Sequence, residues 1–500
     1  MSAAENGQKV FIETYGCQMN VLDSELVQNQ FEALGYTFVD KPQKAQVVLL
    51  NTCSVRDLSE QKVWSQLGRL GISKREHRPD TVIGVLGCMA EREGKEIIRR
   101  MPHVDVLCGP SNLDQLPSLV DNALKNRQHH VALSGHTSRR SKTLEHAQDN
   151  LEALDLSRSF SPTGSGAQAY VRITRGCNKF CSFCVVPFTR GPEVHRPPGH
   201  IVEEVKRLVG QGILEVTLLG QTVNHYAHAD GGKTTSFADL LGLIHEQVPE
   251  LPRLRFITSY PRDFTDDALD VMAECERICR YLHIPAQSGS NRMLKAMNRG
   301  YTVEEYEGLL ERARSRMPNI RLAGDMIVGF PGETDADHQA SIEMLKRARY
   351  KSCFVFKYSP RSGTVAHRRL EDDVPEGVKK VRNIELLETQ NAISQEVLGG
   401  YVGQTLQVLV EDFGKFKKAP PPPGEVVIGW QKPKVESSWK QLRGRTEGDE
   451  IVVFEGPSDL LGTITEVRAL RATPLTVHGE WALADGLKVQ AATDNAGMQP

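Results

Sequence analysis

The amino-acid sequence predicts an α/β protein with three parts: an N-terminal domain with a parallel α/β sheet, a central open (β/α)6 barrel and a small C-terminal β-barrel. Short apolar runs alternate with amphipathic stretches in residues 8–125 and again in residues 166–400, as in proteins with parallel sheets. Beyond Tyr401 the pattern changes to short β-like runs with Gly and Pro, which is typical of small barrels. A length of 500 residues is also too great for one ordinary hydrophobic core.

The charge and the cysteine content narrow the class of protein. The formal net charge of −2 is nearly balanced, so any contact with nucleic acid must be a local patch. The first residues lack the basic and apolar regions of a signal peptide, and no apolar stretch is long enough to span a bilayer. Ten cysteines among 500 residues are too few for a disulfide scaffold. We therefore expect reduced thiols in a soluble, cytoplasmic protein with no membrane partner.

The N-terminal domain, residues 8–125, is predicted to alternate strands with helices. The expected strands are Val10–Tyr15, Val47–Asn51, Val82–Leu86 and Val104–Leu107, and the expected helices are Val21–Leu34, Leu58–Leu70 and Glu91–Arg100. Cys17, Cys53 and Cys88 follow the first three strands. Because ligands bind at the carboxyl ends of strands in open α/β sheets, these thiols are expected at one rim. A single cysteine there is more often a small buried hydrophobe, but three in register favour a cluster held by three thiolates.

Residues 126–165 are predicted to be a linker. The stretch 111–156 loses strand periodicity and becomes polar, and its histidines are interpreted as solvated side chains rather than ligands. Ser157–Gly166 is rich in Ser, Gly and Pro and is interpreted as the domain boundary itself.

The central domain, residues 166–400, is predicted to contain six β/α units with the functional site at the carboxyl ends of the strands. The expected strands are Ala169–Thr174, Glu215–Leu219, Leu254–Thr258, Tyr281–Ile284, Ile320–Val328 and Cys353–Lys357. The expected helices are Ile201–Gln211, Phe237–Gln247, Asp266–Cys279, Ser290–Met297, Val303–Arg316, Asp335–Ala348 and Pro375–Leu398.

A loop with three closely spaced cysteines, Cys177, Cys181 and Cys184, follows the first of these strands. A structural zinc ion or an ordinary ferredoxin cluster takes four protein ligands. Three thiolates leave one iron of a [4Fe–4S] cluster open for a small molecule. The alternatives are a zinc loop that borrows a distant fourth ligand and three unrelated thiols.

The remaining cysteines are interpreted as structural. Cys275 and Cys279 stand four residues apart on the predicted helix Asp266–Cys279, so both would face the same way, and this apolar face lies away from any strand end. Simple packing is therefore expected for this pair, and also for Cys108 and Cys353.

The C-terminal part is predicted to be a small barrel over residues 401–470 followed by a disordered tail over residues 471–500. The expected strands are Thr405–Val410, Glu425–Ile428, Glu450–Phe454 and Leu461–Glu466. Lys415–Gly424 contains four consecutive prolines, which cannot continue a central strand, and is expected to be an exposed insertion.

Stretches spread over almost the whole chain resemble one known family. They are FIETYGCQMNVLDSE, LLNTCSVR, GVLGCMAER, RGCNKFCSFCVVPFTRGPEVHRP, LLGQTVNHY, HIPAQSGSNRMLKAMNRGYT, DMIVGFPGET, FKYSPRSGT and LRGRTEGDEIVVFEG. The chain is similar to the radical S-adenosylmethionine (SAM) methylthiotransferases, and within them to the members that act on N6-dimethylallyladenosine in tRNA. The resemblance implies an N-terminal methylthiotransferase domain, a radical SAM core and a C-terminal TRAM domain.

The resemblance also implies cofactors, ligands and an activity. Cys177, Cys181 and Cys184 would hold a [4Fe–4S] cluster that binds SAM, and Cys17, Cys53 and Cys88 would hold an auxiliary [4Fe–4S] cluster. The implied reaction converts N6-dimethylallyladenosine at position 37, just 3′ of the anticodon, to its 2-methylthio derivative. One SAM molecule would methylate a sulfur carried on the auxiliary cluster, and a second would give the 5′-deoxyadenosyl radical that allows C–H to be replaced by C–SCH3. No catalytic residue is assigned beyond the cluster ligands.

Further expectations concern cofactor contacts and partners. Phe183 would pack on the adenine of SAM, Gln221 and Asn224 would offer polar groups, and Gly329 would let the backbone approach the adenine. Packing around the cluster is the alternative for Phe183, and turn chemistry is the alternative for the others. The implied partners are a tRNA anticodon stem-loop, an electron donor such as a flavodoxin or ferredoxin, and a sulfur source.

RNA contacts are expected in the C-terminal domain, because enzymes that act on a base need it unstacked and loops make this less costly. The candidate residues for its backbone are Lys432, Lys434, Lys440, Arg443 and Arg445. A solvated charged face is the alternative. The stretch 415–434 is longer and more Pro-rich than the family pattern.

Three rival functions are considered. A methylthiotransferase for a ribosomal-protein aspartate typically carries Asp-Arg where this chain has Asn178 and Lys179. A methylthiotransferase for threonylcarbamoyl-adenosine in tRNA is disfavoured by the N-terminal TYGCQMN stretch. A non-catalytic RNA-binding iron–sulfur protein is disfavoured because all six cluster cysteines are present.

Overall fold

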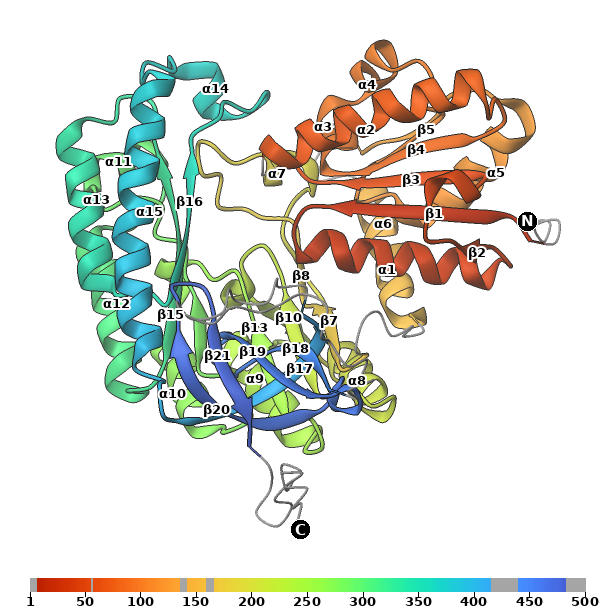
Figure 1. The fold of residues 1–500 in the computed structure, drawn as a ribbon. Coiled ribbons are helices and arrows are strands. Elements are labelled where there is room, and N and C mark those ends of the chain that lie inside the picture. Colours follow the sequence, from red (N-terminus) through yellow and green to blue (C-terminus); the bar gives the residue numbers. More distant parts are fainter. Residues whose placement is uncertain (1–6, 55–56, 135–141, 159–165, 415–438, 483–500) are drawn as a thin grey trace, which may run out of the picture. The chain divides into compact units, whose positions relative to one another are not determined.

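The computed structural model describes residues 7–54, 57–134, 142–158, 166–414 and 439–482. The chain divides into two compact units, Met1–Gln390 and Asn391–Pro500. Figure 1 shows the elements of both units.

The first unit begins with a six-stranded sheet in the order β2-β1-β3-β4-β5-β6, and every pairing in it is parallel. Its strands are β1 (Lys9–Tyr15), β2 (Thr37–Phe38), β3 (Val47–Thr52), β4 (Val82–Gly87), β5 (Val106–Cys108) and β6 (His130–Ala132). Strands β3 and β4 are buried along their whole length, as in parallel sheets covered on both faces.

Helices cover both faces of this sheet. They are α1 (Gln18–Ala33), α2 (Asp57–Glu76), α3 (Cys88–Glu93), α4 (Lys95–Arg100) and α5 (Leu116–Asn126). Phe31 of α1 and Val120 of α5 belong to the core on one face. Leu67 of α2 and Ile97 of α4 belong to the core on the other. The predicted parallel α/β domain is therefore confirmed.

The predicted linker, residues 126–165, is wrong in part. Strand β6 lies inside it and extends the sheet by pairing with β5. Helix α6 (Lys142–Ser157) also lies inside it, and Leu151 of this helix is buried in the core. A three-residue edge strand and a mostly polar helix carry too few apolar residues to show a periodicity, so the sequence did not reveal them. Residues 135–141 and 159–165 of the interval lie outside the described residues.

The core of the first unit has six parallel strands in chain order, which confirms the open (β/α)6 arrangement. The strands are β7 (Gln168–Arg172), β10 (Glu215–Leu219), β13 (Arg253–Phe256), β14 (Tyr281–His283), β15 (Arg321–Val328) and β16 (Ser352–Lys357). A parallel bridge between Leu254 and Ile278 joins the first three strands to the last three.

The main helices of this barrel are α8 (Pro198–Gly210), α9 (Phe237–Gln247), α10 (Asp266–Glu274), α11 (Asn291–Ala296), α12 (Val303–Arg316), α13 (Asp335–Ala348) and α15 (Glu376–Gly399). Figure 1 shows α11, α12, α13 and α15 on the same side of the strands β15 and β16. The starts of α9, α12 and α13 are fixed by reciprocal capping boxes that Ser236, Thr302 and Thr334 begin.

The predicted helix Asp266–Cys279 is too long. Helix α10 ends at Glu274, because the chain after Cys275 leaves the helix to form the bridge of Ile278 with Leu254. Cys275 and Cys279 therefore do not share a helical face. Cys279 is buried, and Cys275 is half-buried.

The second unit contains a closed barrel in the order β17-β18-β19-β21-β20, which confirms the small C-terminal barrel. Its strands are β17 (Thr405–Phe413), β18 (Trp439–Arg445), β19 (Ile451–Pro457), β20 (Ile464–Ala472) and β21 (Val477–Trp481). The expected end at residue 470 is too early, because β21 closes the barrel by pairing with β19 and β20. The expected strand Glu425–Ile428 and the insertion Lys415–Gly424 lie outside the described residues.

Among the described residues, no helix is both long enough and apolar enough to cross a membrane.

Candidate functional site

Cys177, Cys181 and Cys184 lie in the loop that follows β7 and the short strand β8 (Thr174–Arg175). The backbone N–H of Lys179 points to Cys177 Sγ over 3.5 Å. Burial and then the neighbouring Cys181 thiol raise the pKa of Cys184. These thiols are thus close enough to interact electrostatically, as their spacing in the sequence predicts.

A buried arginine from a distant element contacts this loop. Arg299 Nη1 lies 3.3 Å from Cys181 Sγ. Its guanidinium group is held by the Tyr301 hydroxyl at 2.8 Å and the Pro285 carbonyl at 2.9 Å. It also stacks over the Tyr260 ring, 4.7 Å from the ring centroid. A fixed positive charge beside the thiols favours their thiolate forms, which are the forms that bind metal.

Cys17, Cys53 and Cys88 come together at the carboxyl ends of three neighbouring strands, β1, β3 and β4. Cys17 precedes α1, Cys53 follows β3, and Cys88 begins α3. A hydrogen bond with Cys53 lowers the pKa of Cys17 to about 6, helped by the charge of Arg190 and by backbone amides. Burial instead raises the pKa of Cys88.

Two buried asparagines support this second group of thiols. Asn20 Nδ2 donates to Asn51 Oδ1 at 3.1 Å, and Asn51 Nδ2 donates to the Asn20 carbonyl at 2.8 Å. Asn20 Oδ1 also accepts from Cys17 Sγ at 3.3 Å. Gly87, just before Cys88, has a φ of +87°, and a Cβ there would lie 2.5 Å from the Thr52 carbonyl oxygen. The ends of β3 and β4 are therefore packed so closely that the turn into Cys88 requires glycine.

Arg190 lies close to the first group of thiols in the sequence and acts on the second group in the fold. It stands six positions after Cys184 in the sequence, yet its charge acts on Cys88 and Cys17 in the N-terminal domain. Its Nη2 atom pairs with Asp23 Oδ2 at 2.8 Å. Because the Arg190 side chain is buried, its charge acts on these thiols with little screening by solvent.

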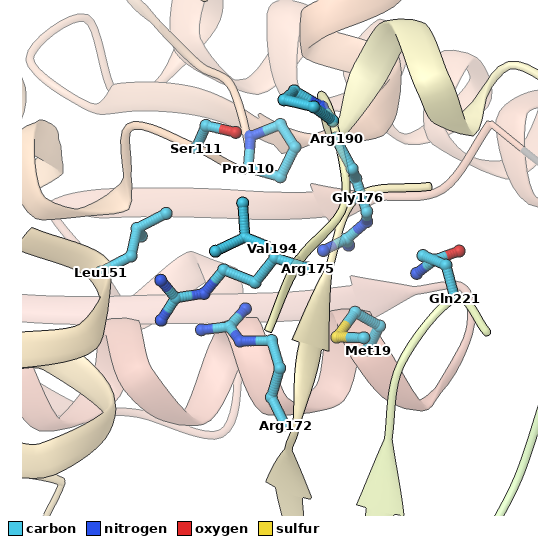
Figure 2. Close-up of a pocket in the computed structure, with 11 residues that line it drawn as sticks. Met19, Pro110, Ser111, Leu151, Arg172, Arg175, Gly176, Arg190, Val194 and Gln221 are labelled. Carbon is cyan, nitrogen blue, oxygen red and sulfur yellow. The ribbon is translucent and has the colours of Figure 1, made fainter. Parts of the chain in front are cut away.

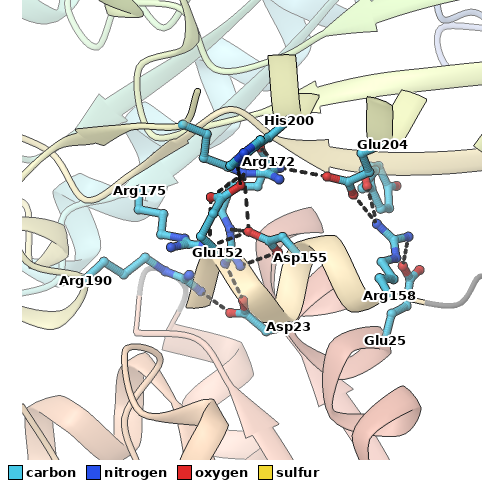
Figure 3. A network of polar contacts seen from close by, with 12 residues as sticks. Asp23, Glu25, Glu152, Asp155, Arg158, Arg172, Arg175, Arg190, His200 and Glu204 are labelled. Carbon is cyan, nitrogen blue, oxygen red and sulfur yellow. Dashed lines mark hydrogen bonds and ion pairs between the residues drawn. The ribbon is translucent and has the colours of Figure 1, made fainter. Parts of the chain in front are cut away.

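Arg190 is one end of a buried ion network, drawn in Figure 3. Asp23 of α1 also pairs with Arg172 of β7 at 3.1 Å, and Arg172 pairs with Asp155 of α6 at 2.7 Å. Further members are Glu25, Glu152, Arg158, Arg175, Arg196 and Glu204. The network joins the N-terminal sheet domain, α6 and the first strands of the barrel.

A cavity of about 40 Å³ lies beside this network (Figure 2). In Figure 2 the guanidinium groups of Arg172 and Arg175 lie next to each other. The lining residues are Met19, Pro110, Ser111, Leu151, Arg172, Arg175, Gly176, Arg190, Pro192, Val194 and Gln221. Gln221, one of the expected cofactor contacts, is thus placed at the wall of this cavity.

The other expected cofactor contacts have structural partners. Phe183 packs edge-on against Phe330, with the ring centroids 6.5 Å apart. Asn224 donates to the Tyr260 carbonyl at 2.8 Å and accepts from the Tyr260 N–H at 2.7 Å. A Cβ on Gly329, whose φ is +69°, would lie 2.2 Å from Lys379 Cγ. The roles of these residues as cofactor contacts stay predictions, as do the alternatives of packing and turn chemistry.

The candidate RNA contacts in the second unit are partly engaged by acidic residues. Arg443 pairs with Asp412, and Arg445 pairs with Asp449 at 2.7 Å. Lys440 lies over the Phe413 ring, 4.7 Å from its centroid. Lys432 and Lys434 lie outside the described residues.

Sequence reasoning missed the supporting residues of both groups of thiols. Each of these residues stands in a short stretch of the sequence: TYGCQMN contains Asn20, LLNTC contains Asn51, VPFTRG contains Arg190 and MNRGYT contains Arg299. The sequence contains these residues but does not show their contacts, because the contacts of Arg190 and Arg299 join residues more than 100 positions apart. No local pattern in one sequence reveals such contacts.

Comparison with known proteins agrees with this architecture. Residues 9–109 match the model of the uncharacterized protein family UPF0004, and residues 171–345 match the radical SAM superfamily. A radical S-adenosylmethionine methyltransferase, TsrM, from Kitasatospora setae shares the fold, with a TM-score of 0.52 and 16% identity over 72% of this chain and 74% of that chain. The fold and the loop of thiols thus define a radical SAM enzyme with an added N-terminal domain.

Curated relatives narrow the class further. A tRNA-2-methylthio-N(6)-dimethylallyladenosine synthase from Rhodopirellula baltica is 42% identical over 92% of this chain and 92% of its own length. A protein of the same name from Porphyromonas gingivalis is 40% identical over 96% of both chains. The chain belongs to this family of radical SAM methylthiotransferases.

Proposed function

We propose that the chain converts N6-dimethylallyladenosine in tRNA to its 2-methylthio derivative. The observation that carries the proposal is the presence of two separate groups of three thiols, one on the radical SAM core and one on the N-terminal sheet. A methylthiolation needs a radical, a sulfur and a methyl group, so a second cluster site beside a radical site fits this reaction. The names of the relatives supply the substrate.

The donor sets fit the two [4Fe–4S] clusters that the family uses. We assign the SAM-binding cluster to Cys177, Cys181 and Cys184, and the auxiliary cluster to Cys17, Cys53 and Cys88. Each set offers three thiols in one place, which leaves one iron open for a further ligand. When bound, the clusters and SAM supply the radical, the sulfur and the methyl group.

The residues around the thiols offset their negative charge and hold the two sites in position. Arg299 offsets the negative charge of the first set of thiolates, and Arg190 does the same for the second. Asn20 and Asn51 hold the strand ends that carry Cys17 and Cys53. The buried network through Asp23 and Arg172 fixes the N-terminal domain against the barrel. One RNA base can therefore reach both sites in turn.

The tRNA would present its anticodon stem-loop, because the adenosine just 3′ of the anticodon lies in a loop where unstacking costs little. We assign the second unit to the RNA backbone, as the family's TRAM domain suggests. An electron donor such as a flavodoxin or ferredoxin and a source of sulfur complete the proposal.

Mass spectrometry of tRNA nucleosides tests the substrate. Cells that lack this gene should lose 2-methylthio-N6-dimethylallyladenosine and accumulate N6-dimethylallyladenosine, and the gene should restore the product. If the methylthio nucleoside persists unchanged, the assignment is wrong. A loss confined to methylthio-threonylcarbamoyl-adenosine or to a modified ribosomal-protein aspartate would identify one of the two rival substrates.

A further inference from the structure

Three side chains that the proposed function does not use meet next to the loop of the first cysteine group. Glu193 precedes the short strand β9 (Val194–His195), His195 ends it, and His225 ends the 3-10 turn η3 (Val223–His225) after β10. One ligand atom of each lies within 4.8 Å of the others. Glu193 Oε2 is 2.9 Å from His225 Nδ1, and Glu193 Oε1 is 3.7 Å from His195 Nε2.

The orientation of the His195 ring is fixed by the backbone of Ala227. Its Nδ1 atom lies 2.7 Å from the Ala227 carbonyl oxygen and 3.0 Å from the Ala227 N–H. The other ring nitrogen, Nε2, is the one that faces Glu193. A histidine that binds a metal through one ring nitrogen is commonly held in place by a contact of its other ring nitrogen.

A buried carboxylate oxygen and a buried imidazole nitrogen face each other in this cluster without a hydrogen bond. Within the described part of the chain, Glu193 Oε1 and His195 Nε2 are both buried and have no hydrogen-bond partner. The Glu193 side chain is only 2% exposed. Leaving such atoms unpaired is unfavourable, and a separation of 3.7 Å is too long for a direct bond.

We propose that Glu193, His195 and His225 bind a divalent transition-metal ion, with Zn²⁺ as the best match. Two histidines and one carboxylate form a known zinc donor set. Two ligands about 2.1 Å from a tetrahedral ion lie about 3.4 Å apart, so the 3.7 Å gap between Oε1 and Nε2 needs little adjustment. The His225 side chain is 42% exposed, which leaves access for the ion and for water as a fourth ligand.

The ion would stabilise one wall of the first cysteine loop. The Cys177 N–H donates to the Gly191 carbonyl at 3.2 Å, and the Glu193 N–H donates to Asn178 Oδ1 at 3.3 Å. The segment from Gly191 to His195 therefore lies against the loop, and the ion would fasten it to η3. This role is structural and does not depend on which RNA base is modified.

The test uses the anaerobically purified full chain with its iron in place, titrated calorimetrically with Zn²⁺ while iron is measured before and after. We expect about one saturable Zn²⁺ site per chain with no loss of iron. His195→Gln and His225→Gln should each weaken binding at least tenfold. His228→Gln is the matched control, because His228 lies on the next strand, β11 (Ala227–Asp230), and outside the cluster, and it should bind like the wild type.

A second measurement keeps the test independent of folding defects in the variants. Co²⁺ bound to the unmodified chain should show weak d–d absorption without a thiolate-to-cobalt charge-transfer band. A charge-transfer band, release of iron, absence of saturable Zn²⁺ binding, or equal loss in His228→Gln would each overturn the site. Both experiments measure metal binding, so the proposed metal site would still stand if the substrate assignment failed.

Discussion

The thiols of the second group differ in their environments, although all follow strand ends of one sheet. Cys17 is half-buried and receives a hydrogen bond from Cys53, whereas Cys88 is 4% exposed and lies in a desolvated position. Since the thiolate is the form that attacks electrophiles and binds metal, Cys17 is the thiol most ready to react in the iron-free chain.

We expect iodoacetamide to alkylate Cys17 before the other two thiols of its group in the iron-free chain. The hydrogen bond from Cys53 lowers the pKa of Cys17 to about 6, so its thiolate fraction should rise as the pH increases through 6 and be nearly complete at pH 8. Peptide mass spectrometry after brief labelling at each pH measures the midpoint. A midpoint near 8.5, the value of an ordinary thiol, would contradict the environment described.

Arg190 should affect the N-terminal thiols rather than the loop in which it lies. Arg190→Gln removes the charge that acts on Cys88 and Cys17 and leaves Asp23 with Arg172 alone. We expect this variant to lose methylthiolation at least tenfold while SAM cleavage to 5′-deoxyadenosine changes less than threefold. Equal loss of both activities would show that Arg190 serves the radical site instead.

At the scale of elements, α6 shows how polar side chains can be structural. Its Asp155 is 1% exposed and pairs with Arg172 and Arg175, and its Glu152 pairs with Arg196. In the sequence these charges are typical of a solvated surface, which is why the segment was predicted to be a linker. The helix instead joins the N-terminal sheet domain to the barrel through buried ion pairs.

Breaking this network should destabilise the first unit strongly. Asp155→Asn leaves buried guanidinium groups without their charge partner, so we expect a loss of about 3 kcal/mol in the free energy of unfolding, measured by urea denaturation. Asp40→Asn is the control, because Asp40 and Lys44 form an exposed pair whose loss should leave the free energy of unfolding nearly unchanged. Similar losses in the two variants would contradict a structural role for the network.

The same contacts determine how the free energy of unfolding depends on pH. Burial raises the pKa of Asp155, but Arg172, Arg175 and Arg196 outweigh it and hold that pKa below its ordinary value of 3.8. The carboxylate therefore contributes its full stability above pH 3.8, and this contribution is lost as the pH falls below that value. The difference in the free energy of unfolding between wild type and Asp155→Asn should therefore become smaller in acid.

The sequence predicted the elements whose residues carry a period or a fixed spacing. The buried strands β3 and β4, the barrel strands and the loop of Cys177, Cys181 and Cys184 were all recognisable from local pattern. Strand β6 and helix α6 were not, because short edge strands and polar helices have no such pattern. The contacts of Arg190 and Arg299 depend on the tertiary fold alone.

At the scale of the whole molecule, the two groups of thiols belong to one compact unit, and the C-terminal barrel forms the other. The groups share no ligand: one set comes from the loop after β7, and the other from the ends of β1, β3 and β4. Two clusters with separate ligands can be removed one at a time.

Iron content should therefore fall in two equal steps. We expect close to eight irons per anaerobically purified chain, and close to four when either group of cysteines is replaced by alanine. Iron near four in the wild type would contradict a second cluster. Full loss of iron on replacing one group would mean that the two sites do not form independently.

The central claim is that one site makes the radical and the other supplies the sulfur, and Cys88→Ala tests it most directly. Cys108→Ala is the control, since Cys108 is buried on the neighbouring strand β5 and is not in the group of Cys88. Both chains are incubated anaerobically with SAM, reductant and an anticodon stem-loop that contains N6-dimethylallyladenosine. We predict that Cys88→Ala forms 5′-deoxyadenosine but no methylthio nucleoside, while Cys108→Ala forms both. Loss of both products in Cys88→Ala, or normal methylthiolation by it, would contradict the account.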